Sequence, residues 1–167
     1  MIILMCLVHT KASSQAMHRL TEKDRQNYVL SINQSVIKLT PKPVYLFKQK
    51  ADITCAAVPV KLENKTSKIL TYTNMSCEWS IIYTTNNKNI SIIGWPCDSN
   101  YPVLLKVAPH SASVVNLPVY FKKSGKKQKF KIGMMLYAND DNILNFTSYN
   151  LRAQSNSLIW SNEVTTP

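Results

Sequence analysis

The chain is 167 residues long, with 45% hydrophobic and 17% charged residues and a formal net charge of +11. Its length and composition fit one globular domain with a short extension, and they exclude a wholly disordered chain. Only three glycines occur, which excludes a glycine-rich phosphate-binding loop.

The first 16 residues predict a signal peptide. Residues 2–8 are a short apolar run, and Ser14 and Ala16 place small side chains where a signal peptidase reads them. Lipidation at Cys6 is the weaker alternative, because no small residue stands just before it. The run is too short for a transmembrane helix, which needs about 20 apolar residues. No other stretch of the sequence predicts a membrane span, because charges and prolines interrupt each one.

Residues 17–34 predict a polar N-terminal extension, and residues 35–167 predict a β-sandwich domain. Strand signals begin near Ser35. Residues Ile53–Leu62 and Lys129–Tyr137 alternate apolar and polar side chains, as half-buried strands do. The inward positions are Ala56, Val58, Val60 and Leu62 in the first segment and Phe130, Ile132, Met134 and Leu136 in the second. About eight or nine short strands, separated by turn residues, predict an all-β, antiparallel immunoglobulin-like β-sandwich.

Residues on either side of Asn87 mirror one another. The mirrored pairs are Ile81 with Ile93, Trp79 with Trp95 and Cys77 with Cys97. Directly opposed residues of an antiparallel hairpin keep a constant sum of residue numbers, so this mirror predicts a hairpin centred on Asn87. It also predicts a Cys77–Cys97 disulfide in an oxidising compartment, and leaves Cys55 as a buried thiol or an intermolecular partner.

Trp79 and Trp95 admit two interpretations. They are a possible aromatic contact for a ligand, or a cross-strand pair packed in the core. Apolar neighbours on the same predicted face, Ile81 and Ile93, favour packing.

Lysines are densest around the predicted turn at Ser124-Gly125. The possible polyanion-binding residues are Lys122, Lys123, Lys126, Lys127 and Lys129. They would bind an anionic glycan or an anionic membrane surface, or else they guard strand edges against aggregation. The scarcity of arginine disfavours sequence-specific nucleic acid as a partner.

No residue spacing predicts catalysis, a metal site or a cofactor. Cys55 and His110 would supply a nucleophile and a base, but their sequence context fits no protease signature. The same two residues with Cys77 and Cys97 lack the ligand spacing of a zinc site.

Three segments carry a family resemblance. "VPVKLENKTSKILTYTNMSCEW", "SASVVNLPVYF" and "KFKIGMMLY" resemble strands of immunoglobulin-like or fibronectin-III-like domains in exported bacterial proteins. The resemblance implies two packed sheets over roughly residues 35–164. We therefore expect a non-enzymatic binding or structural module, secreted, periplasmic or at the cell surface, that meets a protein or an acidic surface ligand. The alternative is a secreted proteinase inhibitor that presents Asn86–Asn89 or Ser124–Lys127.

Overall fold

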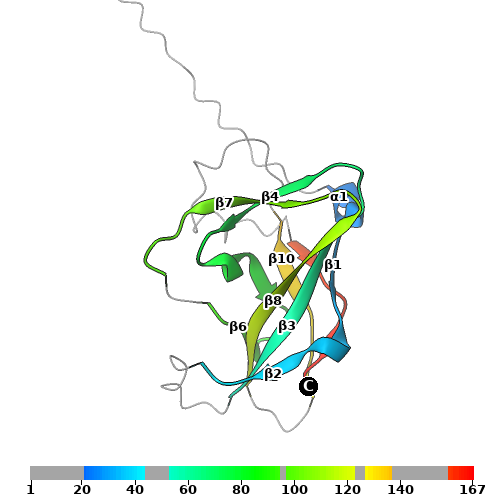
Figure 1. Cartoon of the computed structure of the whole chain (residues 1–167). Coiled ribbons are helices and arrows are strands. Elements are labelled where there is room, and N and C mark those ends of the chain that lie inside the picture. The colour runs from blue at the N-terminus through cyan, green and yellow to red at the C-terminus, as the bar shows by residue number, and fades with distance from the viewer. Residues whose placement is uncertain (1–20, 44–52, 95–96, 123–126, 137–157) are drawn as a thin grey trace, which may run out of the picture.

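The computed structural model describes residues 21–43, 53–94, 97–122, 127–136 and 158–167, and most of them lie in antiparallel β-structure (Figure 1). The elements in chain order are α1 (Glu22–Asn27), β1 (Tyr28–Ile32), η1 (Gln34–Val36), β2 (Lys38–Thr40), β3 (Ile53–Asn64), β4 (Leu70–Met75), η3 (Trp79–Ile82), β5 (Tyr83–Thr85), β6 (Ile90–Ile92), β7 (Pro102–Val107), β8 (Ser111–Lys122), β9 (Lys129–Phe130), β10 (Ile132–Met135), β11 (Leu158–Trp160) and β12 (Val164–Thr165). Within these ranges, no helix has the length and apolar character to cross a membrane.

Two long strands, β3 and β8, form the centre of the fold. They pair over their full 12 residues, from Ile53 opposite Lys122 to Asn64 opposite Ser111. β1 and β2 both pair with the other edge of β3, and β6 pairs with the other edge of β8. Pro59 has no N–H to donate, and it falls in the gap between the β1 and β2 pairings, where β3 lacks a partner on that side.

The remaining described strands form three smaller sheets. β10 lies between β5 and β11, β9 pairs with β12, and β4 pairs with β7. The two predicted alternations are confirmed, because all eight of their inward side chains are buried. The second segment is interrupted at Lys131, so it forms β9 and β10 instead of one strand. Phe121 on β8 contacts Phe130 on β9, with ring centroids 5.8 Å apart, within the main core.

The predicted hairpin around Asn87 is wrong. Trp79 and Ile81 lie in the 3-10 helix η3, and the two short strands that follow do not pair with each other. β5 pairs with β10, and β6 pairs with β8. Each strand therefore satisfies its backbone groups in a different sheet, against the buried residues of β10 and the 12-residue β8. Trp95 lies outside the described residues.

Cys77 and Cys97 nevertheless form the predicted disulfide, with their Cα atoms 6.1 Å apart. The cause is the β4–β7 pair, which places the end of β4 opposite the start of β7. The chain between β4 and β7 contributes β5 to one sheet and β6 to another. The disulfide joins the two ends of this segment. Ser76 N donates to Tyr101 O at 2.8 Å beside this bridge. We call residues 78–96 the closed excursion.

Regular structure begins earlier than Ser35. Thr21 and Asp24 form a capping box that starts α1, and β1 follows directly at Tyr28. β1 pairs with β3 through five residues, so a segment expected to lie in a polar extension is part of the main sheet. Its apolar side chains, Leu30 and Ile32, are buried. The five residues of β1 are too few, next to the polar residues before Tyr28, for alternation to be recognised in the sequence.

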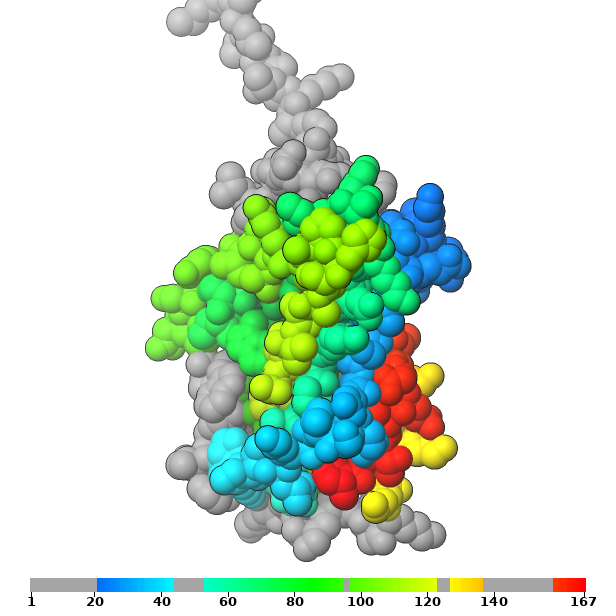
Figure 2. All heavy atoms as spheres, turned by 45° about the vertical axis from the view of Figure 1, so that its right-hand side comes forward, coloured from blue at the N-terminus to red at the C-terminus, as the bar shows by residue number. Residues whose placement is uncertain are grey.

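Two side-chain amides join the N-terminal and C-terminal parts of the chain, which lie side by side in Figure 2. The Asn162 amide accepts from Ile32 N at 2.8 Å and donates to Ile32 O at 3.0 Å. The Gln34 amide likewise donates to Thr165 O at 2.7 Å and accepts from Thr165 N at 2.6 Å. Each side-chain amide thus makes the pair of hydrogen bonds that the backbone of a neighbouring strand would make with Ile32 or Thr165. We call this pair of contacts the amide clasp.

A buried amide organises the opposite end of β3. Asn64 is fully buried, and its Nδ2 donates to the carbonyls of Lys68, Val107 and Ala108. Its Oδ1 accepts from both N and Oγ1 of Thr66. One side chain therefore satisfies groups of the β3–β4 turn and the β7–β8 turn at once.

Candidate functional site

Three segments meet where β8 ends. The first is the turn between β5 and β6, which includes Asn86 and Asn89; the others are the end of β8 at Lys122 and the link between β9 and β10 at Lys131. Lys122 N donates to Asn89 O at 2.8 Å. Lys131 N donates to Asn86 Oδ1 at 2.7 Å, and Asn86 N donates to Lys131 O at 3.4 Å. These backbone contacts fix lysine-bearing segments side by side although they are far apart in sequence.

The β5–β6 turn is rigidly built. Asn87 Oδ1 accepts from Asn89 N at 2.9 Å, and Asn87 Nδ2 donates to Lys129 O at 3.0 Å. Ile90 N donates to Asn87 O at 3.0 Å, which closes the turn. Asparagine side chains commonly stabilise turns by bonding to backbone two residues on. The arrangement presents the exposed Lys88 at the turn, so its position is fixed by the fold.

We call Lys88, Lys122, Lys127, Lys129 and Lys131 the basic end. Four of these side chains are exposed, and Lys131 is half-buried. Lys129 Nζ lies 3.1 Å from Glu163 Oε1, so part of its charge is compensated. Of the five lysines predicted for polyanion binding, Lys122, Lys127 and Lys129 are described, whereas Lys123 and Lys126 lie outside the described residues.

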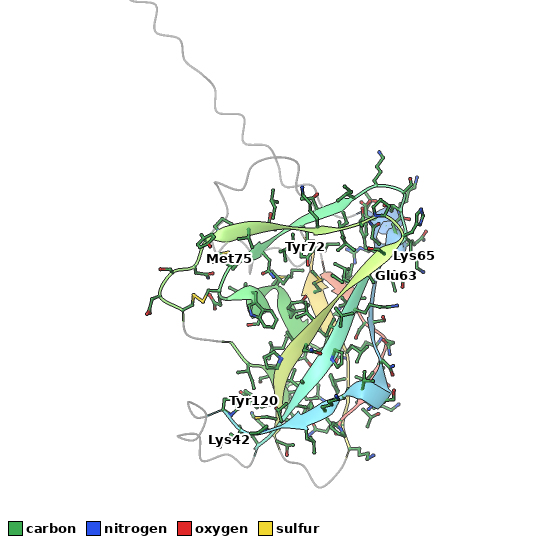
Figure 3. All side chains as sticks on the ribbon, viewed as in Figure 1. Lys42, Glu63, Lys65, Tyr72, Met75 and Tyr120 are labelled. Carbon is green, nitrogen blue, oxygen red and sulfur yellow. A yellow bond between two sulfur atoms is a disulfide. The ribbon has the colours of Figure 1, made fainter. Side chains whose placement is uncertain are left out.

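Lys42 belongs to the same region. Figure 3 places it beside Tyr120, two residues before the end of β8. Lys42 and Lys88 were missed by sequence reasoning, because each reaches this region only through long-range strand pairing: β2 with β3, and β6 with β8. No local signal in the sequence reports those pairings.

The other end of the long strands carries charges of both signs. Glu63 pairs with Lys61 at 3.2 Å, and Figure 3 shows Glu63 at the end of β3 away from Lys42. Glu22 and Asp24 lie in α1, near that same end (Figure 1). Lys61 and Lys65 lie beside Glu63 at this end, and Lys23 and Arg25 lie in α1, so both ends of the β3–β8 pair carry cations.

Trp79 is half-buried and packs against the main core. Its ring meets Tyr83 edge-on, with centroids 6.5 Å apart and an interplanar angle of 82°. This contact accounts for the placement of Trp79 by packing. The pairing with Trp95 as an aromatic platform stays a prediction, since Trp95 is outside the described residues.

Cys55 and His110 cannot form a catalytic pair. Cys55 lies opposite Tyr120, whereas His110 precedes Ser111, which lies opposite Asn64. Nine residues of extended strand separate these levels, a distance of about 30 Å. Cys55 is a free thiol, buried against Ile93 with Ile53 and Tyr120 nearby. Burial raises the pKa of this thiol, and the charge of Lys42 opposes that shift only partly.

Two other features bear on possible chemistry: a groove and the distribution of metal-ligating side chains. A groove of about 590 Å³ lies between the end of β1, η1, β3 and the C-terminal segment, but its amide groups from Gln34 and Asn162 already serve the amide clasp. Across the residues that the structure describes, no three His, Cys, Asp or Glu side chains gather as metal ligands would.

Neither protein-family models nor curated protein sequences match this chain.

Proposed function

We propose that the protein is an exported, non-enzymatic binding module that attaches to acidic polymers through the basic end. The convergence of lysines from three separate segments, held together by backbone hydrogen bonds, carries this proposal. Turns that are fixed in this way hold the backbone positions of these lysines before binding, so only the side chains must be ordered on association.

Export is supported by the apolar N-terminal segment and by the Cys77–Cys97 disulfide, since such bridges persist in oxidising compartments. We also propose that the four described sheets are a divergent immunoglobulin-like sandwich. The support is the packing of β8 on β9 through Phe121 and Phe130, which brings separate sheets together across one core.

The proteinase-inhibitor alternative receives less support. The Asn86–Asn89 turn is bound on both sides, to Lys122 and to Lys131, and does not offer a free extended segment to a protease cleft. The other candidate loop, Ser124–Lys127, lies largely outside the described residues.

The decisive experiment compares two variants with equal net charge. The first variant replaces four lysines of the basic end, Lys88, Lys122, Lys127 and Lys131, with Gln. The control variant replaces four exposed lysines elsewhere with Gln: Lys23, Lys65, Lys68 and Lys106. Binding to dextran sulfate, to anionic vesicles and to duplex DNA is measured at 0.15 M salt. Exposed ion pairs are each worth about 0.2–1 kcal/mol, so the first variant should lose roughly 1–4 kcal/mol of binding free energy.

The control variant should keep most of the affinity, because its lysines lie away from the basic end. Equal losses in both variants would show that only total charge matters, and binding to none of the three probes would remove the proposed function.

A further inference from the structure

We infer that folding and N-glycosylation exclude each other at Asn64, and that the protein is therefore exported by a route that does not glycosylate Asn-x-Ser/Thr sites. The inference rests on the export that belongs to the proposed function and names its route. It follows from the burial of Asn64, the hydrogen bonds of its amide nitrogen and the order in which the chain is synthesised.

Two asparagines that a eukaryotic oligosaccharyltransferase would accept are buried in the fold. Residues 64–66 read NKT and residues 74–76 read NMS, and both match the acceptor pattern, in which the middle residue is not proline. Asn64 is 0% exposed and Asn74 is 4% exposed. A glycan is bulky and hydrated, so an asparagine that carries one must lie at the surface of the folded protein.

The amide nitrogen of Asn64, to which the sugar would be joined, already makes three hydrogen bonds. It donates to the carbonyls of Lys68, Val107 and Ala108 at 2.8, 3.1 and 3.1 Å. Glycosyl transfer would join Nδ2 to C1 of the first sugar, break the bond between C1 and the diphosphate of a lipid-linked oligosaccharide, and release one amide proton. A single N–H would then face three carbonyls, and the sugar would have to occupy the buried space between two turns. The glycosylated chain therefore cannot form this part of the fold.

In a eukaryotic secretory pathway, Asn64 would reach the transferase before its hydrogen-bond partners are made. Val107 and Ala108 lie 43 and 44 residues further along the chain. Ser111, which lies opposite Asn64 on β8, follows them. At about 5–20 residues per second, synthesis of that stretch takes roughly 2–9 s. The transferase acts on the growing chain, so it would meet Asn64 as an unfolded and accessible acceptor.

Asn33 provides an internal comparison, because its site forms the same local turn. Asn33 Oδ1 accepts from Ser35 N at 3.1 Å and from Ser35 Oγ at 2.8 Å. Asn64 Oδ1 accepts from Thr66 N at 3.0 Å and from Thr66 Oγ1 at 2.8 Å. Asn33 is exposed, however, and both of these bonds use its oxygen. A glycan on Asn33 is therefore compatible with the described fold, and the two acceptors differ in burial and not in local conformation.

The test directs the whole chain into the secretory pathway of cultured animal cells, with and without tunicamycin, which blocks synthesis of the lipid-linked sugar donor. Every sample carries Ser76→Ala, which removes the acceptor at Asn74. We expect peptide mapping to find a glycan on Asn33 but none on Asn64 in the secreted, disulfide-bonded fraction, and a glycan on Asn64 in the retained fraction. Tunicamycin should raise the secreted yield at least threefold, relative to a co-expressed secreted protein without acceptor sites.

Two further substitutions form a matched pair. Thr66→Ser keeps the hydroxyl group that bonds to Asn64 but makes a less efficient acceptor site, so it should raise the secreted yield at least twofold. Ser35→Ala removes the acceptor at Asn33 and should change the yield less than 1.5-fold. Equal yields of the two variants would overturn the inference.

The protein from its own source tests the export route directly. Asn33, the exposed acceptor, should be unmodified there, and a glycan on it would overturn the proposed route. In the animal cells, secreted protein with Asn64 mostly glycosylated would overturn the inference, because folding would then tolerate the sugar. Absence of that glycan from both fractions would overturn it too, since folding would then precede transfer. These results leave binding by the basic end standing, because that binding is measured on protein made in bacteria without these glycans.

Discussion

A substitution in the amide clasp tests how the segment around Ile32 and Gln34 is held to the C-terminal segment. Asn162→Asp changes one NH2 group into an oxygen and preserves the side-chain shape. One carboxylate oxygen can still accept from Ile32 N, but the other now faces Ile32 O, to which Asn162 Nδ2 donates at 3.0 Å in the native protein. The substitution removes a hydrogen bond and sets two acceptors against each other.

The expected cost is about 1–2 kcal/mol of unfolding free energy at neutral pH. A net hydrogen bond is worth about 1 kcal/mol, and an unsatisfied partner adds about 1–3 kcal/mol when buried. Asn162 is exposed, so water relieves part of that second cost. For a domain of this size, such a loss lowers the melting temperature by roughly 2–8 °C.

The penalty should depend on pH in a defined direction. The carbonyl of Ile32 favours the protonated acid, which can donate a proton to it, so the pKa of the introduced carboxyl is raised in the folded protein. The folded state then binds more protons than the unfolded state, and stability falls as pH rises through the raised pKa. The penalty should therefore be full at neutral pH and shrink as pH is lowered toward about 4, the ordinary value for Asp.

Urea denaturation at several pH values measures this, with Asn116→Asp as the matched control. Asn116 is exposed on β8 of the same sheet, and its substitution should stay within about 0.5 kcal/mol of the native protein. Equal stabilities of the two variants, or a penalty for Asn162→Asp that does not change with pH, would refute the role of the clasp.

Three further predictions concern stability and reactivity. Replacing Cys77 and Cys97 with Ser should lower the unfolding free energy by about 3 kcal/mol, because the bridge spans a sequence separation of 20, and the reduced native protein should match the variant in denaturation curves. Asn64→Ala should cost about 3 kcal/mol or more in urea titrations, since it strips buried carbonyls of their donor; a loss below about 1 kcal/mol would contradict this. Cys55 should resist a thiol reagent at pH 8 in folded protein lacking the first 16 residues and react in guanidinium, and fast labelling before unfolding would disprove its burial.

Local periodicity predicted the strand faces well. The alternation in Ile53–Leu62 and in Lys129–Tyr137 depends only on which side of a strand is buried, and both sets of inward residues are buried. Which strands pair with one another was predicted less well. The mirror around Asn87 assumed that neighbours in sequence pair, but β5 and β6 found longer apolar partners in β10 and β8.

The candidate site divides in the same way. Lys122, Lys127 and Lys129 form a dense run in the sequence and were visible there. Lys42 and Lys88 join them only because β2 pairs with β3 and β6 with β8, and such pairings are decided by burial over the whole sheet. The disulfide was predicted correctly from the wrong hairpin, since β4 and β7 bring its cysteines together.

The closed excursion makes the sheets mechanically interdependent. It supplies β5 to the sheet of β10 and β6 to the sheet of β8, within one short stretch anchored at Cys77 and Cys97. If the sheet of β10 moved away from the sheet of β8, the short segment that joins β5 to β6 would be stretched. The domain accordingly lacks a plane of easy local opening, and its described sheets should unfold together as one cooperative unit.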